Sequence, residues 1–395
     1  MRGGAYSNIA IRTETRELST PDARQAQALA FGTLRHLRRI DRALSSVVRR
    51  PRLDPEVEDL LRVAVFDLLL SPTPDYVAVH EAVEAVKAGG RGHAAGFVNG
   101  VLRTLGREGE PVSEPGVPQR SLELGVSEWL YAELIDQFGV EEAEAFLAAS
   151  LADAPLTVRA RPGAPEPPSG AVPVPGIADC YVFPPGPVTG RFVVQDPASV
   201  AVGWATHAQP GELVLDVAAA PGGKTLHLFD QMAKGSGSPP EIQAQGSTRL
   251  VAMDRHSGRV ERARRRAPAL WTVADGTRPP FRPETFDLVL LDAPCTGLGT
   301  LRRRPELRHR VTPDEVERLA ALQRRMLTAS AGLVKPGGRL VYSVCTVTST
   351  ETVEVVADFE ARAPTGLPGR PWGKGWLMGP HLTGTDGMFI AEVLL

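Results

Sequence analysis

The stretch Leu213–Thr225, LVLDVAAAPGGKT, most constrains what this chain of 395 residues can fold into. An apolar run ends in Asp216, and small residues then lead through Gly222 and Gly223 to Lys224. The pattern is typical of a strand that turns into a helix at the carboxyl edge of a parallel sheet, where backbone N–H groups face a ligand. Small residues let the backbone approach that ligand closely, and glycine permits a positive φ. We therefore expect a ligand-binding turn here.

Two kinds of ligand fit such a turn. Gly223, Lys224 and Thr225 match the end of a P-loop, but Ala218 stands where that motif opens with glycine. A nucleoside cofactor instead needs an acid at the end of the next strand, to bind the ribose hydroxyls, and Asp254 ends the apolar run from Leu250. The cofactor interpretation is favoured over a P-loop NTPase and over a glycine turn without a ligand.

Length and composition predict an ordinary globular protein of two or three domains, with 43% hydrophobic and 23% charged residues. No apolar run is long enough to span a membrane, and Met1–Ala5 lacks a signal-peptide core, so we expect a cytoplasmic protein without membrane contact. The three cysteines, Cys180, Cys295 and Cys345, form neither a disulfide framework nor a zinc-ligand pattern. We expect no metal.

Three segments concentrate arginine although the net charge is only −2. Residues 35–52 hold seven Arg against one Asp, while residues 259–266 and 301–310 hold five Arg each against one Glu. A charge run is usually a solvated face, but three runs, one of them beside a candidate active site, favour binding of phosphate groups.

The order of helical and strand patterns predicts the domain organisation. Helical periodicity covers residues 23–105, with breaks at Pro51, 71–74 and 89–90, and two further helices are expected at 127–138 and 141–151. Residues 106–120 have the composition of a linker; a strand is expected at 156–159, and the proline-rich segment 161–190 can hardly pack alone. From Phe192 onward strands and helices alternate, as in a doubly wound α/β domain; the expected strands are 213–217, 250–254, 270–273, 288–292, 338–344 and 388–394, with a polar excursion at 234–248. The predicted domains are therefore 1–110 (all-α), 111–190 (linker and small α/β connecting subdomain) and 191–395 (Rossmann-like).

Two cysteines follow expected strands of this last domain. Cys295 comes after the run that ends in Asp292, and Cys345 comes after Val341–Val344. The carboxyl ends of parallel strands carry the sites of open α/β sheets. One such thiol would usually be a buried structural residue, but two above a cofactor turn favour chemistry.

Methylation of carbon 5 of a pyrimidine combines a thiol with S-adenosyl-L-methionine. A thiolate that adds to carbon 6 makes carbon 5 nucleophilic enough to accept the methyl group, and the thiol is eliminated afterwards. An acid such as Asp292 at the N3/N4 edge of the ring would favour cytosine. The residues alone do not rank Cys295 and Cys345 as nucleophile.

The catalytic half resembles the Sun-type RNA cytosine-C5 methyltransferases (the NOP2/Sun family), and in particular their bacterial 16S rRNA branch. The motifs that carry this resemblance are Asp216–Thr225, Asp292–Glu306, Tyr342–Thr346, Gln195–Ser199 and Thr385–Phe389. The N-terminal helices resemble a NusB-like domain, through Val79–Val83 and Gly96–Arg103.

The resemblance implies a role for each matching residue. Cys345 would be the nucleophile, and Cys295 would assist in product release. Asp254 would bind the ribose, Asp275 the adenine edge, and Asp292 the methionine end or the base. The remaining cofactor residues would be Ala218, Ala219, Ala220, Pro221, Gly222, Gly223 and Lys224.

The resemblance, together with the arginine clusters, thus implies a monomeric RNA methyltransferase that uses S-adenosyl-L-methionine and binds RNA, expected to be 16S rRNA, through those clusters and the NusB-like domain. The sequence departs from the family at Val344, where threonine is usual, in the short connection between Arg159 and Arg191, and in a degenerate first helix before Thr20. A non-catalytic RNA-binding assembly factor, or an enzyme acting on DNA, are the competing hypotheses. A measurement of S-adenosyl-L-methionine binding distinguishes the assembly factor from an enzyme. A comparison of RNA and DNA as substrates distinguishes an RNA methyltransferase from a DNA methyltransferase.

Overall fold

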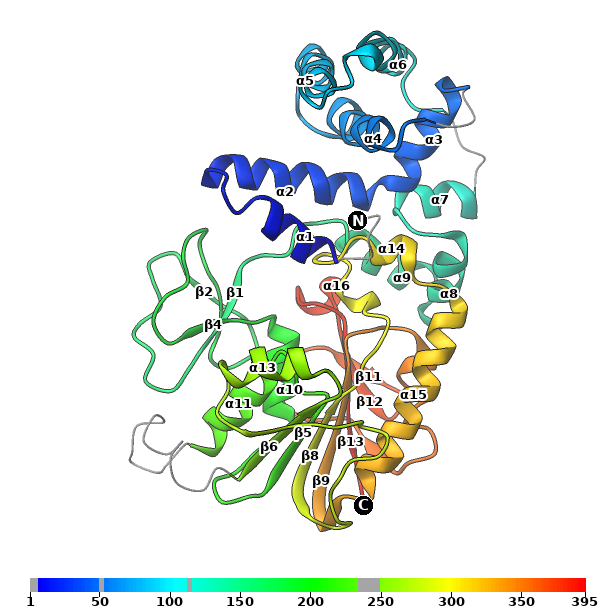
Figure 1. Ribbon diagram of the computed structural model, residues 1–395. Coiled ribbons are helices and arrows are strands. Elements are labelled where there is room, and N and C mark those ends of the chain that lie inside the picture. Colours follow the sequence, from blue (N-terminus) through cyan, green and yellow to red (C-terminus); the bar gives the residue numbers. More distant parts are fainter. Residues whose placement is uncertain (1–5, 50–52, 112–115, 234–248) are drawn as a thin grey trace. The chain divides into compact units, whose positions relative to one another are not determined.

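The computed structural model describes residues 6–49, 53–111, 116–233 and 249–395, and the chain divides into two compact units (Figure 1). The first comprises Met1–Ala152 with Leu301–Arg310, and the second comprises Asp153–Thr300 with Val311–Leu395. The two units group the chain by internal contacts, and the domain boundaries expected at residues 110 and 190 stay predictions. The predicted middle segment is shared, because its helices pack within the first unit and its strands within the second.

The first unit begins with six α-helices. They are α1 (Ser7–Glu14), α2 (Thr20–Arg35), α3 (Leu37–Val47), α4 (Pro55–Leu70), α5 (Asp75–Ala88) and α6 (Ala95–Glu108). N-cap side chains stabilise the first turns of two of these helices. Ser19 accepts a hydrogen bond from the N–H of Asp22 in α2, and Asp54 accepts hydrogen bonds from the N–H groups of Glu56 and Val57 in α4. The predicted breaks at 71–74 and 89–90 are confirmed, whereas Pro51 lies outside the described residues.

This unit also contains α7 (Val117–Glu123), α8 (Glu128–Phe138), α9 (Val140–Ala149) and the short helix α14 (Leu307–Arg310). The predicted helices at 127–138 and 141–151 are thereby confirmed. The linker expected at 106–120 is shorter than predicted, since α6 extends to Glu108 and α7 begins at Val117. The apolar sides of α8 and α9 are buried, with Leu134 and Leu147 fully inaccessible.

The second unit contains a small antiparallel sheet in the order β2-β3-β1-β4. Its strands are β1 (Thr157–Ala160), β2 (Val172–Pro173), β3 (Cys180–Val182) and β4 (Phe192–Val194). The proline-rich segment therefore does pack, through pairing of β3 with β1 and through Val174, Ile177 and Cys180, which join an apolar cluster with residues of the main sheet. Arg159 lies in β1 and forms a buried ion pair of 2.8 Å with Asp230. This pair links the small sheet to helix α11 (Gly223–Met232) of the same unit.

The main sheet of the second unit has the order β11-β12-β13-β9-β8-β5-β6-β7 (Figure 1). Parallel pairing joins β9 (Val334–Val344), β8 (Phe286–Asp292), β5 (Val214–Val217), β6 (Leu250–Asp254) and β7 (Leu270–Val273). β13 (Met388–Val393) pairs antiparallel with β9, and β12 (Gly375–Met378), β11 (Arg370–Trp372) and β10 (Ala361–Arg362) extend the antiparallel part. All six predicted strands are confirmed; the excursion at 234–248 lies outside the described residues.

Alternate residues of each central strand face opposite sides of this sheet. Leu215 and Val289 belong to one apolar cluster, together with Leu327 of α15 (Pro313–Ala331). Val214 and Leu288 belong to the other, with helices α10 (Pro197–Ala205) and α11. The doubly wound architecture is thereby confirmed, because helices cover both faces of a mostly parallel sheet. Within the part of the chain that the structure describes, no helix is long and apolar enough to cross a membrane.

Candidate active site

The turn after β5 begins the site. Ala218 has a φ of 60° and Gly222 a φ of 93°, while Gly223 is already the first residue of α11. Of the two glycines that would permit a positive φ, only Gly222 adopts one, and Ala218 is the other left-handed residue of the turn. The N–H of Ala219 donates to the carbonyl of Met253 over 2.8 Å, which holds the turn against the end of β6.

The surroundings of the Asp216 carboxylate show whether this turn can bind a cofactor that carries an ammonium group. Its side chain is fully buried, and Thr225 donates to its Oδ2 over 2.6 Å. Its Oδ1 is also buried and has no hydrogen-bond partner among the described residues. Burial raises the pKa of Asp216 to about 7, against the hydrogen bond from Thr225. A buried acceptor without a donor fits the amino group of the methionine portion of S-adenosyl-L-methionine.

Asp254 and Asp275 lie at the same edge of the sheet but differ in surroundings. Asp254 is buried at the end of β6, where its Oδ1 accepts from the N–H of His256 over 2.9 Å and Oδ2 lies 3.6 Å from Arg259. Asp275 is exposed, and the N–H and hydroxyl of Thr277 lower its pKa. The N–H of Ala274 donates to the carbonyl of Asp254, so both acids stand beside each other along the edge.

Lys224 and Asp292 form an ion pair that the sequence did not predict. Lys224 Nζ lies 2.8 Å from Asp292 Oδ2, and Ser343 Oγ donates to Asp292 Oδ1 over 2.8 Å. Burial lowers the pKa of Lys224, but the charge of Asp292 and its hydrogen bond raise the pKa of Lys224 above its ordinary value. Cys345 and Asp216 make smaller contributions in the same direction. The ammonium of Lys224 therefore lies beside Asp292 and interacts electrostatically with Cys345.

The two thiols meet at the ends of β8 and β9. Cys295 Sγ lies 3.3 Å from Cys345 Sγ, and both side chains are partly buried. The hydrogen bond with Cys345 and then burial raise the pKa of Cys295 well above its ordinary value. Cys295 is thus held as a thiol that can donate to Cys345. Cys180 is buried in β3 instead, where burial raises its pKa to about 12.

Backbone contacts join the motif loops around these thiols. Gly299 donates to the carbonyl of Cys345 over 3.0 Å, and Gly387 donates to the carbonyl of Gly299 over 2.8 Å. A Cβ on Gly299 would lie 2.1 Å from the carbonyl oxygen of Gly387, so only glycine fits. Asp386 donates its N–H to Asp196 Oδ1 over 3.2 Å. This hydrogen bond connects the Thr385–Phe389 motif with the Gln195–Ser199 motif.

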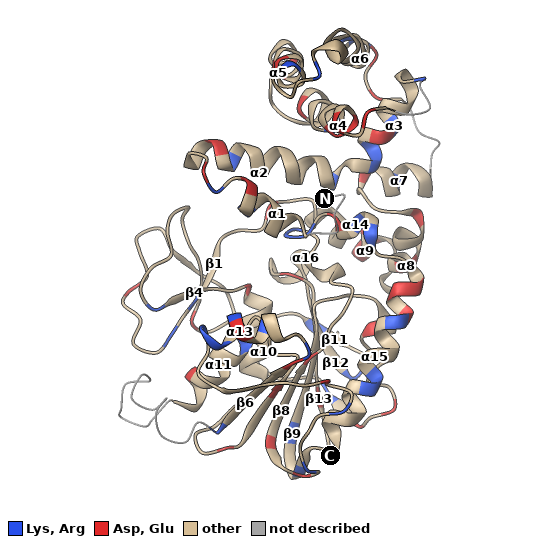
Figure 2. Ribbon diagram, viewed as in Figure 1, with Lys and Arg blue, Asp and Glu red and all other residues tan. Residues whose placement is uncertain are grey.

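Figure 2 marks the Lys and Arg positions along the ribbon, and only part of the arginine clusters is exposed for phosphate binding. In the first unit Arg35, Arg302 and Arg308 are buried; burial and the charge of Arg35 lower the pKa of Arg308 to about 9, and Arg308 donates to the carbonyl of Leu124. The expectation that residues 301–310 bind phosphate is therefore wrong for Arg302 and Arg308. The cluster at 259–266, on and after α13 (Ser257–Arg264), is exposed in the second unit.

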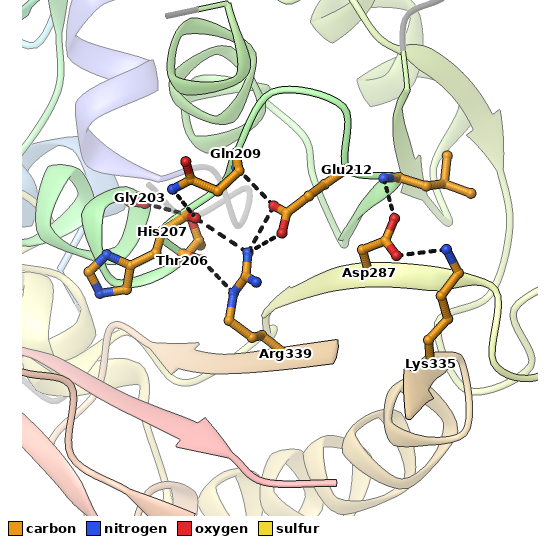
Figure 3. Close-up of polar contacts among 9 residues, drawn as sticks. Gly203, Thr206, His207, Gln209, Glu212, Asp287, Lys335 and Arg339 are labelled. Atoms are coloured by element: carbon orange, nitrogen blue, oxygen red, sulfur yellow. Dashed lines mark hydrogen bonds and ion pairs between the residues drawn. The ribbon is translucent and has the colours of Figure 1, made fainter. Parts of the chain in front are cut away.

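A second polar cluster lies at the opposite edge of the main sheet (Figure 3). It lines a shallow hollow formed by residues 210–212, Asp287 and 335–339. Asp287 accepts from Lys335 and from the N–H of Leu213, and Glu212 pairs with Arg339. These charges satisfy one another at the amino ends of the parallel strands, away from the thiols. Among the described residues, no cluster of His, Cys, Asp and Glu is arranged to hold a metal.

Comparison with known proteins decides the family. The family model described as 16S rRNA methyltransferase RsmB/F matches residues 204–394, and the NusB family model matches residues 2–107. A probable ribosomal RNA small subunit methyltransferase B of Bacillus subtilis is 32% identical over 440 residues, covering 98% of this chain and 94% of the relative. The chain belongs to the RsmB/F family of Sun-type methyltransferases. Its N-terminal domain is NusB-like, it uses S-adenosyl-L-methionine, and it methylates RNA.

Other relatives agree with this assignment. The ribosomal RNA small subunit methyltransferase B of Thermus thermophilus is 36% identical over 384 residues, covering 92% of this chain and 85% of the relative. The crystal structure of PH0851 superposes with a TM-score of 0.80 at 23% identity, covering 97% of this chain and 93% of that one. At that identity the likeness concerns the fold, which is common to both chains over nearly their whole length.

Proposed function

We propose that this member of the RsmB/F family methylates carbon 5 of a cytosine in 16S rRNA. The observation that carries the proposal is the 3.3 Å approach of Cys295 Sγ and Cys345 Sγ beside the Lys224–Asp292 pair. Two thiols above a cofactor turn suit a reaction in which one bonds to the base and the other helps to release it. The names of the family model and of the relatives support ribosomal RNA of the small subunit as the substrate.

Cys345 acts as the nucleophile in this proposal. The ammonium of Lys224 favours a thiolate on Cys345, whereas Cys295 keeps its proton. Cys345 Sγ bonds to carbon 6 of the cytosine, and the electron pair of the C5–C6 double bond moves to carbon 5. S-adenosyl-L-methionine supplies the methyl group that carbon 5 accepts. A base then accepts the carbon 5 proton, the C5–C6 double bond forms again, and the bond between carbon 6 and Cys345 breaks, which leaves Cys345 as a thiolate.

Cys295 and Asp292 have supporting roles in the same steps. The S–H of Cys295 faces Cys345 and can donate a hydrogen bond to the departing thiolate. Asp292 is partly exposed at the end of β8 and has Lys224 and Ser343 as partners, so its carboxylate is fixed where the polar edge of a cytosine can reach it. Ala218–Lys224, Asp254 and Asp275 bind the cofactor, and Asp216 is added to that set because no described residue forms a hydrogen bond to its buried Oδ1.

The exposed arginines of 259–266 and the NusB-like domain bind the RNA backbone, and the target base leaves its stack to reach Cys345. We further propose that the protein acts as a monomer in the cytoplasm. Light scattering of the purified protein across a concentration series tests the monomer.

The deciding experiment compares wild type, Cys345→Ala and Cys295→Ala with labelled S-adenosyl-L-methionine and 16S rRNA. We expect Cys345→Ala to be inert and Cys295→Ala to accumulate a denaturant-stable adduct with RNA, whose mapping identifies the cytosine. Methyl transfer by Cys345→Ala would refute the nucleophile assignment. Absence of transfer by wild type to any RNA would favour the assembly-factor hypothesis instead, whereas transfer only to DNA would change the substrate.

A further inference from the structure

Glu351 lies behind the two thiols and touches the loop of each. It ends the short helix Ser349–Glu351 that follows β9, and its side chain is fully buried. Its Oε1 accepts from the N–H of Thr296 over 2.9 Å, and its Oε2 accepts from the hydroxyl of Thr346 over 3.0 Å. Thr296 directly follows Cys295, and Thr346 directly follows Cys345.

Further donors complete the surroundings of this carboxylate. Oε2 also accepts from the hydroxyls of Thr296 and Thr348, at 2.5 and 3.1 Å, and Oε1 accepts from Gln323 Nε2 at 3.0 Å. Gln323 Nε2 also donates to the carbonyl of Pro294 over 2.9 Å, on the other side of Cys295. All of these contacts of the two oxygens are with N–H or O–H donors, which is the arrangement that suits a carboxylate.

The backbone of Glu351 is held as firmly as its side chain. Tyr342 donates its hydroxyl to the carbonyl of Glu351 over 2.8 Å, from within β9. The hydroxyls of Thr296 and Thr346 also lie 2.9 Å apart, so the residues after the two cysteines contact each other as well as Glu351. Neither cysteine loop can move away from the other without breaking hydrogen bonds to this one buried anion.

We infer that Glu351 is a positioning residue that fixes the separation of Cys295 and Cys345. The inference rests on the proposed function for its effect on catalysis, but the positions of the thiols can be measured without it. Glu351 touches neither base nor cofactor in this role. Its negative charge also disfavours a thiolate on Cys295, and so preserves the difference between the two thiols.

The first variant is Glu351→Gln, which keeps the shape but turns an amide N–H₂ toward donors. We expect kcat to fall about 10- to 100-fold, as for other groups that orient reacting residues, with the KM for RNA and the affinity for S-adenosyl-L-methionine changed less than about twofold. The pH profile of kcat should also shift in this variant, on the limb that reports ionisation of the thiols. Loss of a purely structural residue would not shift that limb.

A milder pair keeps the test valid if Glu351→Gln does not fold. Thr296→Val removes the hydroxyl at almost constant shape and should lower kcat, whereas Thr296→Ser retains the hydroxyl and should restore it. Thr206→Val is the matched control, because Thr206 is equally buried and donates to the carbonyl of Gly203 at a place that touches neither cysteine loop. Its kcat should match that of wild type.

A trivalent arsenical, phenylarsine oxide, reports thiol separation independently of methyl transfer, because it bonds two adjacent sulfurs and releases water. Wild type should bind one equivalent through Cys295 and Cys345, and Glu351→Gln and Thr296→Val should bind it at least several-fold more weakly. Unchanged arsenical binding with unchanged kcat would overturn the positioning role. If wild type methylates no cytosine but the arsenical result holds, the proposed function fails and the positioning role survives.

Discussion

Cys295 Sγ and Cys345 Sγ lie 3.3 Å apart although fifty positions separate the two residues in the chain. Parallel pairing of β8 with β9 brings them together, since Asp292 is directly opposite Ser343 in the register, and Cys295 follows Asp292 by three residues while Cys345 follows Ser343 by two. The parallel pairing of β5 with β8 places the ammonium of Lys224, on the helix after β5, beside Asp292. The chemistry of this site therefore depends on strand neighbours rather than on any single motif.

The three thiols should differ in their reaction with iodoacetamide at about pH 8. Raised pKa values keep Cys295 and Cys180 as thiols, and only thiolates react, so Cys345 should be alkylated first. Peptide mapping by mass spectrometry measures the order. In Cys345→Ser the overall rate should fall to that of the two remaining thiols; preferential labelling of Cys295 in wild type would contradict the assignment.

Cofactor affinity should increase with pH through the pKa of Asp216. Because burial raises that pKa to about 7, only about a tenth of the side chain is ionised at pH 6, and the ionised form is the better acceptor for an ammonium group. Titration calorimetry should therefore show S-adenosyl-L-methionine binding up to about tenfold more tightly at pH 8 than at pH 6. Asp216→Asn should bind weakly at both values, and an equal pH dependence in that variant would assign the titration to another group.

The helical unit should lose stability as the pH falls from about 6.5 toward 4. Burial lowers the pKa values of His36 and His309 to about 4, so the unfolded chain binds these protons before the folded chain does. Each histidine should cost about 2 kcal/mol of unfolding free energy at pH 5. Hydrogen exchange in α2 and α3 at pH 5 and pH 7 measures the loss.

The control for this prediction is His309→Gln, which can still donate to the carbonyl of Leu34, the partner of His309 Nε2 over 2.7 Å. This variant should lose less protection between pH 7 and pH 5 than wild type does. If both proteins respond equally, His309 is not responsible for the acid sensitivity.

RNA binding should depend on salt through the exposed arginines after β6. Replacing Arg265, whose side chain is 80% exposed, by glutamine should flatten the slope of log K against log salt by about 0.7 if it contacts one phosphate of a single strand. Arg318→Gln on α15 is the matched control, with 65% of its side chain exposed. Filter binding at several salt concentrations measures both slopes, and equal slopes for the two variants would argue against a specific role of the 259–266 cluster.

Much of the second unit was predictable because buried strands carry a local signal. Apolar runs such as Leu288–Leu291 are bounded by polar residues and turn residues, and each predicted run became a strand of the main sheet. The strands β10, β11 and β12 were missed, since they have only two to four residues and lie at or near the antiparallel edge. The turn at Gly373 between β11 and β12 was the available signal.

The arginines of 301–310 were misinterpreted for a different reason. A run of positive charge is normally solvated, and nothing local distinguishes Arg308 from its neighbours. In the structure this segment packs within the helical unit, where Arg308 bonds to the carbonyl of Leu124 and Glu306 accepts from Ser7. The partners are separated by 184 and 299 positions, so the sequence pattern alone could not show them.

The sequence by itself determined the elements and the chemical groups of the site: a strand, a tight turn and a helix at Asp216–Thr225, and acids and thiols at the ends of later strands. These features depend on residues that are close in the chain, whose side-chain periodicity and turn chemistry are local. Only the tertiary structure decided that the two thiols meet, that Lys224 pairs with Asp292 and that Glu351 joins both cysteine loops. Those relationships depend on the order and register of β5, β8 and β9, which packing between distant segments sets.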